Sequence, residues 1–379
     1  MDVAPLNADR VLVVNAGSSS LKLRVVEPDD EVTVSFDLSP DASRSGDADL
    51  EDALSEAGCI DAVGHRVVHG GQRFRSSVRI DDDVHRELRS VTDLAPQHQP
   101  LSLAGIEAVA ARLPRTPAVA CFDTAFHARL PPEAATYAIP ADWRQRYGIA
   151  RYGFHGLSHA HAARRAAELL GRAPADVRIV TCHLGAGASL AAVRGGVAVD
   201  TTMGFTPLEG LVMATRSGTV DPGAVLWLLR RAGLSADEVA GALEHGSGLK
   251  GLAGTADMRE VLDAADAGDA AAGLARDVYV HRLSASVAAM AASTNGLDAL
   301  VFTGGVGENA PAIRARAADR LRFLGVEVDP DRNSAAAPDA DVGASGAAVR
   351  TLVVRAREDL EIARQVRAVL SGATQPDVA

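Results

Sequence analysis

The sequence predicts an α/β protein built from two similar domains, and three observations support this prediction. The chain has 379 residues, which is more than one hydrophobic core usually accommodates and is typical of two domains. Apolar strand segments alternate with helical segments, as expected for mixed sheets flanked by helices. A glycine-rich strand–turn–strand pattern occurs near residue 16 and again near residue 185. The repetition indicates a duplicated domain, and we expect the two turns to face a shared cleft.

Charge and cysteine content exclude several classes of protein. The formal net charge of −11 argues against non-specific binding of DNA or RNA, and it means that an anionic substrate needs arginines close to it. Cys59, Cys121 and Cys182 form no CxxC pair, so we expect a cytoplasmic location and no disulfide framework. The first ten residues lack the basic and apolar runs of a signal peptide, and charged residues interrupt the most apolar helical segment, 278–292. We therefore expect neither a signal peptide nor a membrane span.

The first glycine turn joins two strands. Residues 11–15 are a buried apolar run, and residues 20–26 alternate between apolar and polar side chains. The P-loop and the dinucleotide-binding motif both run from strand to helix, so neither is present here. Residues 177–200 repeat the pattern as three strands separated by two glycine turns.

A third glycine turn follows a strand at 299–302 and leads into a helix. Gly304, Gly305 and Gly307 form this turn, and Pro311 lies in the first turn of the helix, whose N-terminus can hold an anion or pack against a nucleotide. Other helices are predicted at 101–112, 158–170 (with Ser158 as its N-cap), 222–232, 236–244, 257–266 and 274–294. Residues 331–346 are predicted to be a loop.

Side chains at the first turn suit phosphate chemistry. Ser18 and Ser20 lie two residues apart and would face the same way in an extended segment, with Lys22 close by. Backbone N–H groups and hydroxyls would then converge on phosphate oxygens, and Asn15 would face the same cleft. Taken alone, each glycine turn is equally compatible with a purely structural hairpin or loop.

Three charged residues stand in unusual positions. Arg66 lies in an apolar strand, where an arginine needs a partner, and forms either a structural salt bridge or a clamp on a carboxylate or phosphate. Arg216 lies in a Gly/Pro-rich loop and is either solvated or part of such a clamp. Asp123 ends the apolar strand 118–122, a common place for a catalytic or metal-binding acid, although a structural role is the alternative.

Two histidines are candidates for contact with a reacting group. His155 precedes a helix whose first turn contains His159, but no third ligand follows at metal-binding spacing, so a zinc site is not expected. His155 and His183 lie beside glycines and are either hydrogen-bond donors to a reacting group or structural residues. The chain has no G-x-S-x-G, which argues against a serine hydrolase of that type.

Taken together, these motifs resemble the acetate kinase family, within the acetate and sugar kinase/heat-shock chaperone/actin superfamily. The matching stretches are NAGSSSLK, GHRVVHGG, FDTAFH, RYGFHGLSH, HLGAGASL, TTMGFTPLEGLVMATRSGTVDPG and FTGGVGEN, in the family's order. They extend from residue 11 to beyond residue 309 and so cover nearly the whole chain. This combination is far more specific than any single glycine turn.

The resemblance implies two duplicated actin-like (ribonuclease H-like) domains with a cleft between them, assembled as a homodimer. The N-terminal domain, residues 1–127 and 358–379, would make acyl and phosphate contacts, and the C-terminal domain, residues 128–357, would bind the nucleotide. The implied reaction is reversible transfer of the γ-phosphoryl group of ATP to acetate or another short carboxylate, giving an acyl phosphate and ADP. Mg²⁺ is the implied metal, with Mn²⁺ as the alternative.

The resemblance also implies roles for individual residues. The catalytic residues would be Arg66, Asp123, His155, His183 and Arg216. The acyl substrate would contact Arg66, Val68, Gln97, Phe154 and Pro207. ATP would contact Ser18, Ser20, Lys22, His183, Gly185, Gly187, Asp257, Met258, Arg259, Gly305, Val306, Gly307 and Asn309. The metal would be held by Asn15 and Glu358.

Three positions depart from the family's pattern. Ala186 stands where the family usually has Asn, which removes one amide donor near the phosphates. The run ARED, 356–359, replaces the family's Thr-Asn-Glu-Glu, so Asp359 competes with Glu358 for the metal role. Gln97 replaces an apolar residue expected to line the acyl pocket, which leaves the preferred acyl chain open.

The chemistry of transfer to a carboxylate agrees with this reading. The acceptor is already ionised, so the protein needs no strong base and must instead align two anions and neutralise their charge. The alternatives are a propionate or butyrate kinase, a sugar kinase, and a non-catalytic nucleotide switch like actin. A sugar kinase would need a base for its hydroxyl acceptor, and a switch would not need two arginines at a carboxylate. The sequence therefore favours an acetate kinase.

Overall fold

The computed structural model describes residues 8–17, 20–39, 48–95 and 98–372. The chain divides into two compact units: unit 1 takes in residues 1–128, 154–161 and 357–379, and unit 2 takes in residues 129–153 and 162–356. Residues 154–161 were expected in the C-terminal domain but belong to unit 1. The reason is that the Gly156 N–H donates a hydrogen bond to the Asp123 carbonyl oxygen and Leu157 packs in that unit's core.

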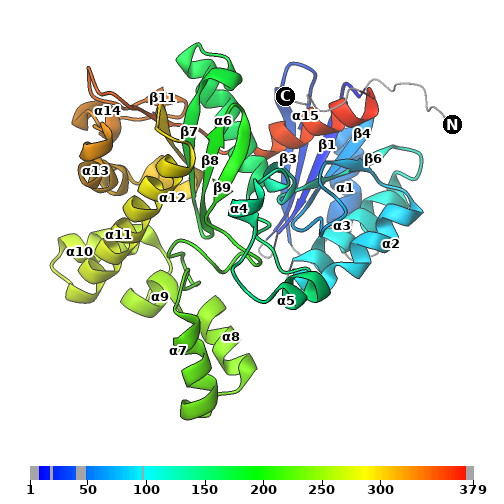
Figure 1. Cartoon of the computed structure of the whole chain (residues 1–379). Coiled ribbons are helices and arrows are strands. Elements are labelled where there is room, and N and C mark those ends of the chain that lie inside the picture. Colours follow the sequence, from blue (N-terminus) through cyan, green and yellow to red (C-terminus); the bar gives the residue numbers. More distant parts are fainter. Residues whose placement is uncertain (1–7, 18–19, 40–47, 96–97, 373–379) are drawn as a thin grey trace. The chain divides into compact units, whose positions relative to one another are not determined.

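Unit 1 contains a mixed sheet with the order β3-β2-β1-β4-β6-β5 within its described residues (Figure 1). The strands are β1 (Val11–Ala16), β2 (Leu21–Val26), β3 (Val32–Leu38), β4 (Ala62–Val67), β5 (Val78–Arg79) and β6 (Ala118–Phe122). β1 pairs antiparallel with β2 and parallel with β4, which in turn pairs parallel with β6. The hairpin predicted at the first glycine turn is confirmed, with Ala16 opposite Leu21.

Unit 2 repeats this topology, with the order β9-β8-β7-β10-β12-β11. Its strands are β7 (Arg178–Leu184), β8 (Ala188–Arg194), β9 (Val197–Thr201), β10 (Ala299–Thr303), β11 (Ala340–Asp341) and β12 (Arg350–Val353). Each pairing has the same sense as its counterpart in unit 1, and both sheets have a register shift in the second hairpin, at Val25/Val26 and at Ala192/Val193. The expected duplicated α/β fold is therefore confirmed.

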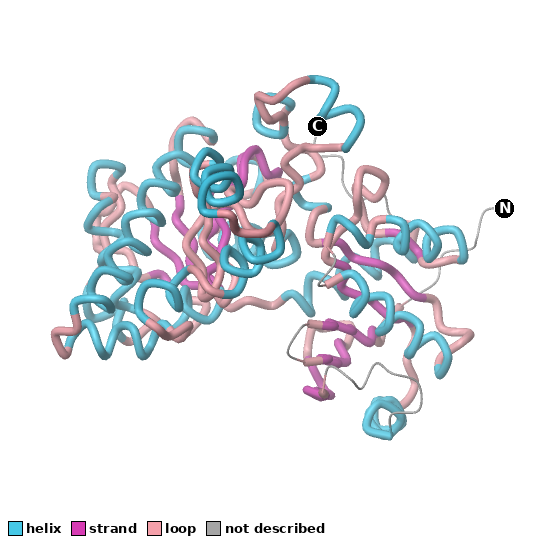
Figure 2. The backbone as a smooth tube through the Cα atoms, turned by 90° about the horizontal axis from the view of Figure 1, so that it is seen from below, coloured by secondary structure: helices cyan, strands magenta, loops and turns pink. Residues whose placement is uncertain are grey.

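Helices pack around both sheets (Figure 2). Unit 1 has α1 (Ala48–Ala57), α2 (Asp82–Ser90), α3 (Gln99–Arg112) and α15 (Glu358–Leu370), and α6 (Gly156–Leu170) begins in this unit and ends in the other. Unit 2 has α4 (Pro132–Ala135), α5 (Ala141–Tyr147), α7 (Pro222–Trp227), α8 (Ala236–His245), α9 (Gly248–Ala253), α10 (Met258–Asp266), α11 (Ala270–Ser293), α12 (Gly304–Asn309), α13 (Pro311–Arg320) and α14 (Pro330–Ser334).

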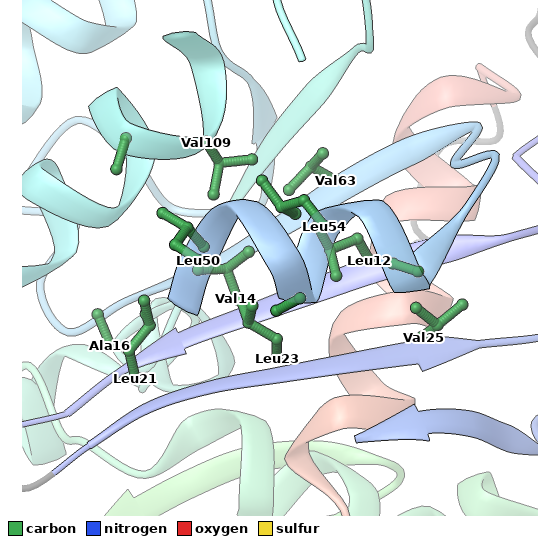
Figure 3. Close-up of a cluster of buried hydrophobic side chains, with 13 residues drawn as sticks. Leu12, Val14, Ala16, Leu21, Leu23, Val25, Leu50, Leu54, Val63 and Val109 are labelled. Atoms are coloured by element: carbon green, nitrogen blue, oxygen red, sulfur yellow. The ribbon is translucent and has the colours of Figure 1, made fainter. Parts of the chain in front are cut away.

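The sheet of unit 1 is buried on both faces because successive side chains of β1 point to opposite sides. Leu12 and Val14 pack against Leu50 of α1 in one apolar cluster (Figure 3). Val13 faces the other way and packs with Ile362 of α15 in a second cluster. Helix α15 thus lies against β1, β4 and β6 and brings the C-terminal part of the chain to the sheet that the N-terminal part begins.

Most predicted elements are present, and the differences have local causes. Helix α6 begins at Gly156, so Ser158 is not its N-cap but a buried residue within the helix. The segment 331–346 was predicted to be a loop, yet it contains most of α14 and the short strand β11. Asp329 caps α14 by accepting the N–H groups of Asp331 and Arg332, and Pro330 opens the helix with its fixed φ.

No helix among the described residues is both long enough and apolar enough to cross a bilayer.

Candidate active site

Three parallel strands of unit 1 carry the central polar residues of the candidate site. Asn15 lies near the end of β1, Arg66 near the end of β4, and Asp123 directly after β6. β4 pairs with both of the other strands, so their carboxyl ends meet at one edge of the sheet. This edge is where open α/β sheets usually place their ligands. The structure thus brings together three residues that lie far apart in the sequence.

The guanidinium of Arg66 is the centre of this group. Its Nη2 donates to Asp123 Oδ2 at 2.6 Å, its Nε donates to Asp123 Oδ1 at 3.3 Å, and its Nη1 donates to Asn15 Oδ1 at 3.1 Å. The Asp123 side chain is 1% exposed and that of Arg66 is 16% exposed. A two-pronged arginine–carboxylate bond of this kind fixes both side chains, so Arg66 is held in one orientation.

Helix α15 adds Glu358 to the same group. Glu358 is the first residue of the helix; its Oε2 accepts from Asn15 Nδ2 at 3.3 Å and lies 3.8 Å from Arg66 Nε. Asp359, its neighbour, faces a different partner. Arg357 donates to both Asp359 carboxylate oxygens: its Nε donates to Oδ1 at 2.9 Å, and its Nη2 donates to Oδ2 at 2.9 Å. Of the two acids that the sequence left as alternatives, the structure places Glu358 beside Asn15 and Arg66.

The electrostatics of the group leave excess negative charge. Burial alone would lower the pKa of Arg66, but the attraction of Asp123 and Glu358 and the hydrogen bond to Asp123 together raise it, so the guanidinium stays charged. One guanidinium then faces two carboxylates, and the group has a formal charge of −1 when both are ionised. A cation placed next to the carboxylates would balance it.

The donor set fits a magnesium ion bound together with phosphates. No group of three or more His, Cys, Asp or Glu side chains arranged to hold a metal is found in the described part of the chain. Mg²⁺, however, prefers oxygen ligands, keeps several waters and is often held by one or two carboxylates plus substrate phosphates. The carboxylate of Glu358 and the amide oxygen of Asn15 are oxygen donors of this kind, whereas both carboxylate oxygens of Asp123 accept from Arg66.

The segment before α6 lies against Asp123. The Gly156 N–H donates to the Asp123 carbonyl oxygen at 2.9 Å, and a Cβ at position 156 would lie only 2.1 Å from that oxygen. His155, with a φ of 55°, directly precedes this contact. Phe154 is buried, its carbonyl oxygen lies 3.1 Å from His127 Nε2, and Val68 follows β4 in the same unit with 5% exposure. Unit 1 therefore holds His155, Phe154 and Val68 as well.

The remaining candidates near the first turn are Ser18, Ser20 and Lys22. Lys22 is exposed on β2, opposite Asn15 in the strand register. The Ser20 carbonyl oxygen accepts from the Gly17 N–H at 2.9 Å and closes the turn. Ser18 and Gln97 lie outside the described residues.

Unit 2 carries the second glycine turn. His183 is part of β7, and the Gly185 N–H donates to the Gly187 carbonyl oxygen at 2.9 Å. This bond spans two residues, whereas the bond from Gly17 to Ser20 in unit 1 spans three. The Ala186 carbonyl oxygen accepts from the Ala214 N–H at 3.1 Å. The backbone of the turn thus persists despite alanine at position 186.

Arg216 lies in unit 2 and is half-buried. Its Nη1 donates to the Pro207 carbonyl oxygen at 2.7 Å. Burial lowers the pKa of Arg216, and the nearby charge of Glu244 opposes this effect. Arg216 and Pro207, which the sequence proposed separately, are therefore in direct contact.

The expected nucleotide residues lie at two helix starts of unit 2. Asp257 caps α10 by accepting the Arg259 N–H, and its carboxylate also pairs with the Arg259 guanidinium. Met258, the residue between them, is buried. These hydrogen bonds from Arg259 lower the pKa of Asp257 to about 2. The third glycine turn follows β10 and forms α12, which includes Gly305, Val306, Gly307 and Asn309.

Sequence reasoning missed several residues that hold these turns. Glu308 Oε1 accepts from the N–H groups of Gly304 and Ala356, at 3.0 and 2.9 Å. Arg151 and Glu209 form an ion pair at 3.0 Å beside the loop that contains Pro207. All three lie inside the motifs GGVGEN, RYGFHGLSH and TPLEG, so the signal was available.

Known proteins resemble this chain along most of its length. The model of the acetokinase family matches residues 47–364. An acetate kinase from Gloeobacter violaceus is 51% identical over 308 residues, which are 81% of this chain and 76% of that protein. Among solved structures, a propionate kinase from Francisella tularensis has a TM-score of 0.88 at 36% identity and covers 95% of this chain and 100% of its own. An acetate kinase from Porphyromonas gingivalis has a TM-score of 0.87 at 36% identity, with coverage of 96% and 100%.

Proposed function

This chain belongs to the acetokinase family, kinases that transfer a phosphoryl group to a carboxylate, and we propose that it catalyses the reversible transfer of the ATP γ-phosphoryl group to acetate. The products are acetyl phosphate and ADP. The observation that carries the proposal is the group at the edge of the first sheet, where Arg66 is fixed by Asp123 and Asn15 and Glu358 completes the set.

The reaction needs positive charge more than it needs a base. A carboxylate oxygen of acetate forms a bond to the γ-phosphorus while the bond from that phosphorus to ADP breaks, and no proton changes place. Arg66 and Arg216 would neutralise the acceptor and the phosphoryl oxygens, and His155 and His183 would donate hydrogen bonds to the phosphoryl group. At an effective dielectric constant of about 20, one charge at about 4 Å contributes about 4 kcal/mol. Two fixed arginines can therefore outweigh the repulsion from a chain of net charge −11.

We assign the metal role to Glu358, with Asn15 beside it. The support is that Glu358 lies in the Arg66 group, whereas Arg357 occupies both oxygens of Asp359. Mg²⁺, with Mn²⁺ as the alternative, would supply further neutralisation of the phosphate oxygens when bound. The role of Arg66 in this arrangement is to bind the acceptor carboxylate, and that of Asp123 is to hold Arg66 in place.

The other contacts are proposed from the family resemblance. The acyl group would contact Val68, Phe154, Pro207 and Gln97. The phosphates would contact Ser18, Ser20, Lys22, Gly185 and Gly187. The adenosine would contact Asp257, Met258, Arg259, Gly305, Val306, Gly307 and Asn309. The support for the last set is that both of its segments open helices of the same unit, after a strand or a capping residue.

We further propose a cytoplasmic homodimer. The support within unit 2 is a run of exposed apolar side chains around α7, namely Val220, Leu226, Trp227 and Leu234. Large exposed apolar surfaces usually mark interaction sites. Light scattering on the purified protein should therefore give twice the mass of one 39.2 kDa chain, and Trp227→Glu should shift it toward the monomer.

The decisive experiment is to trap the acyl phosphate with hydroxylamine in the presence of ATP and Mg²⁺. Acetate should give a hydroxamate, and formate, propionate, butyrate and glycolate are the comparison acceptors. Absence of hydroxamate with every acid would refute a carboxylate kinase. A higher kcat/KM for propionate would make the chain a propionate kinase, the function named for one of the similar structures. Preference for glycolate, lost in Gln97→Leu, would indicate a hydroxy-acid substrate.

A further inference from the structure

A half-buried polar cluster in unit 2, formed by Tyr137, Arg151 and Glu209, takes no part in the function proposed above. Glu209 Oε1 accepts from Arg151 Nη2 at 3.0 Å, and Glu209 Oε2 accepts from the Tyr137 hydroxyl. The Arg151 guanidinium also lies over the Tyr137 ring, 5.2 Å from its centre. The side chains of Arg151 and Glu209 are 17% and 32% exposed, so the ion pair is only partly screened by water.

The cluster holds one loop at both of its ends and in its middle. Arg151 Nη1 donates to the carbonyl oxygens of Thr202 and Met203, at 3.3 and 3.1 Å, where the loop leaves β9. The Phe205 N–H donates to the Tyr137 hydroxyl oxygen at 3.0 Å. Glu209 closes the loop seven residues after it begins at Thr202. Burial, followed by the hydrogen bond with Glu209, raises the pKa of Tyr137, so its hydroxyl keeps its proton at neutral pH.

Gly204 shows how closely the cluster fits this loop. A Cβ at position 204 would lie within 2.0 Å of the Tyr137 hydroxyl oxygen and 1.8 Å of Glu209 Oε2. A side chain at this position would therefore force the Tyr137 hydroxyl and the Glu209 carboxylate to shift.

The same loop presents the acceptor that holds Arg216. The carbonyl oxygen bonded by Arg216 Nη1 belongs to Pro207, two residues before Glu209 and two after Phe205. Residues 210 and 219 then lie side by side: the Thr219 N–H donates to the Gly210 carbonyl oxygen at 3.0 Å, and the Gly210 N–H donates to the Thr219 hydroxyl oxygen at 3.1 Å. The position of the Pro207 carbonyl, and with it the direction of Arg216, is therefore set on both sides by contacts of the cluster.

We propose that Tyr137, Arg151 and Glu209 are positioning residues that fix Arg216 and Pro207 for phosphoryl transfer. The proposal rests on the role given to Arg216 above. It differs from a purely structural role in one respect: loosening the cluster should affect the chemical step through Arg216, beyond any loss of stability. A displacement of about 1 Å at a group that stabilises the transition state can lower the rate by about 10²-fold.

Two conservative variants test the proposal. Glu209→Gln keeps the shape but removes the charge, and its amide nitrogen would face a second donor. Tyr137→Phe removes one oxygen and leaves both Glu209 and the Phe205 N–H without that partner. Each variant should lower kcat with acetate at least about tenfold, while KM for ATP changes less than about twofold, because the proposed adenosine contacts lie elsewhere.

Asp298→Asn is the matched control. Asp298 also pairs with an arginine of unit 2, Arg178, at 2.8 Å, and its side chain is 18% exposed. This pair lies at the start of β7, at the opposite end of the strand from the glycine turn. Asp298→Asn should lower the melting temperature by an amount similar to Glu209→Gln and leave kcat unchanged.

A double-mutant cycle separates this proposal from the proposed function. Wild-type acetyl phosphate formation tests the function first, without reference to the cluster. In an Arg216→Ala background, Glu209→Gln and Tyr137→Phe should then lower kcat by less than about twofold further, because the residue through which they act is gone. Full tenfold effects in that background, or kcat values equal to that of Asp298→Asn in the wild-type background, would overturn the positioning role. If Glu209→Gln does not fold, Tyr137→Phe carries the same test.

Discussion

Arg216 is the residue whose replacement should most directly separate catalysis from folding. Its guanidinium is half-buried and donates to the Pro207 carbonyl oxygen. If it neutralises charge in the transition state, Arg216→Ala should lower kcat by about 10²–10³-fold. Arg216→Lys should recover little of this, because a single ammonium does not reproduce a planar fork. Kinetics of hydroxamate formation, with thermal melts as the folding control, measure both. A kcat near that of the wild type in the alanine variant would remove Arg216 from the mechanism.

Glu358 and Asp359 offer a comparison between adjacent acids with different partners. Glu358 faces Asn15 and Arg66, whereas Asp359 is bound by Arg357. Glu358→Gln should therefore raise the Mg²⁺ concentration for half-maximal activity by at least about tenfold, and Asp359→Asn should leave it nearly unchanged. Titration of activity with Mg²⁺ measures this directly. The reverse result would transfer the metal role to Asp359 and show that Arg357 gives way when the metal binds.

At the residue scale, the sequence could predict the chemical types at the site but not their pairing. Arg66 in an apolar strand predicted a partner, and Asp123 at a strand end predicted a catalytic or metal-binding acid; the structure makes the two residues partners of one another. Strand order decides this, since β4 must lie beside β6, and no local pattern encodes that order. The choice between Glu358 and Asp359 also needed the structure, because helical periodicity places adjacent residues on different sides without saying which side meets the sheet.

At the scale of elements, the contact between β4 and α15 sets the position of Glu358, the first residue of that helix. Gly64 of β4 leaves room for this helix: a Cβ there would lie 2.5 Å from Ile362 Cγ2 and 2.7 Å from Val366 Cγ2. Both neighbours are β-branched and cannot rotate away easily in a helix. Gly64→Ala should therefore displace α15, lower the free energy of unfolding by about 1–3 kcal/mol and raise the Mg²⁺ requirement. Urea unfolding and Mg²⁺ titration are the two measurements.

Gly105→Ala is the control for this substitution. Position 105 lies in α3, and its Cβ would meet Ala16 Cβ at 3.5 Å, an ordinary contact. Removing a glycine from a helix interior should stabilise the protein by up to about 1 kcal/mol. If Gly64→Ala is as well tolerated as Gly105→Ala, then the fit of α15 against β4 does not set the position of Glu358.

Element boundaries were predictable where a local signal fixes them. Ser235 forms a capping box with Glu238 at the start of α8, which begins at Ala236 as predicted. Asp257 caps α10, which begins at Met258, one residue after the predicted start. Helix α6 begins earlier than predicted because a tertiary contact, the hydrogen bond from Gly156 to Asp123, replaces a side-chain cap. The start of a helix that is fixed by contact with a distant strand end cannot be predicted from the residues next to it in the sequence.

At the scale of the whole molecule, the two units share one topology but divide the proposed work. Unit 1 holds the Arg66 group and Glu358, and unit 2 holds Arg216, His183 and the third glycine turn. The sequence revealed the duplication because each half begins with a glycine turn between antiparallel strands. It did not reveal that residues 154–161 join unit 1, because only the contacts with Asp123 and the core of that unit place them there.

Buried histidines should make the stability of unit 1 depend on pH. Burial lowers the pKa of His65 to about 3, and that of His69 and of His127 to about 4, from an ordinary value of 6.5. The unfolded chain therefore takes up protons below pH 6.5 that the folded unit refuses until about pH 3–4. Since the unfolded state then binds more protons, the free energy of unfolding falls as the pH falls through this window.

The size of this effect is large compared with ordinary stability. At pH 5 each of the three histidines should lower the free energy of unfolding by about 2 kcal/mol relative to pH 8, and the total of about 6 kcal/mol lies within the range of typical unfolding free energies. Urea unfolding followed from pH 8 to pH 5 should therefore show a steep loss, well above the range in which carboxylates protonate. His127→Gln removes one titrating group, so it should make this loss smaller by about one third even if it lowers stability at pH 8. An unfolding free energy that stays constant from pH 8 to pH 5 would mean that these histidines accept protons without leaving the folded structure.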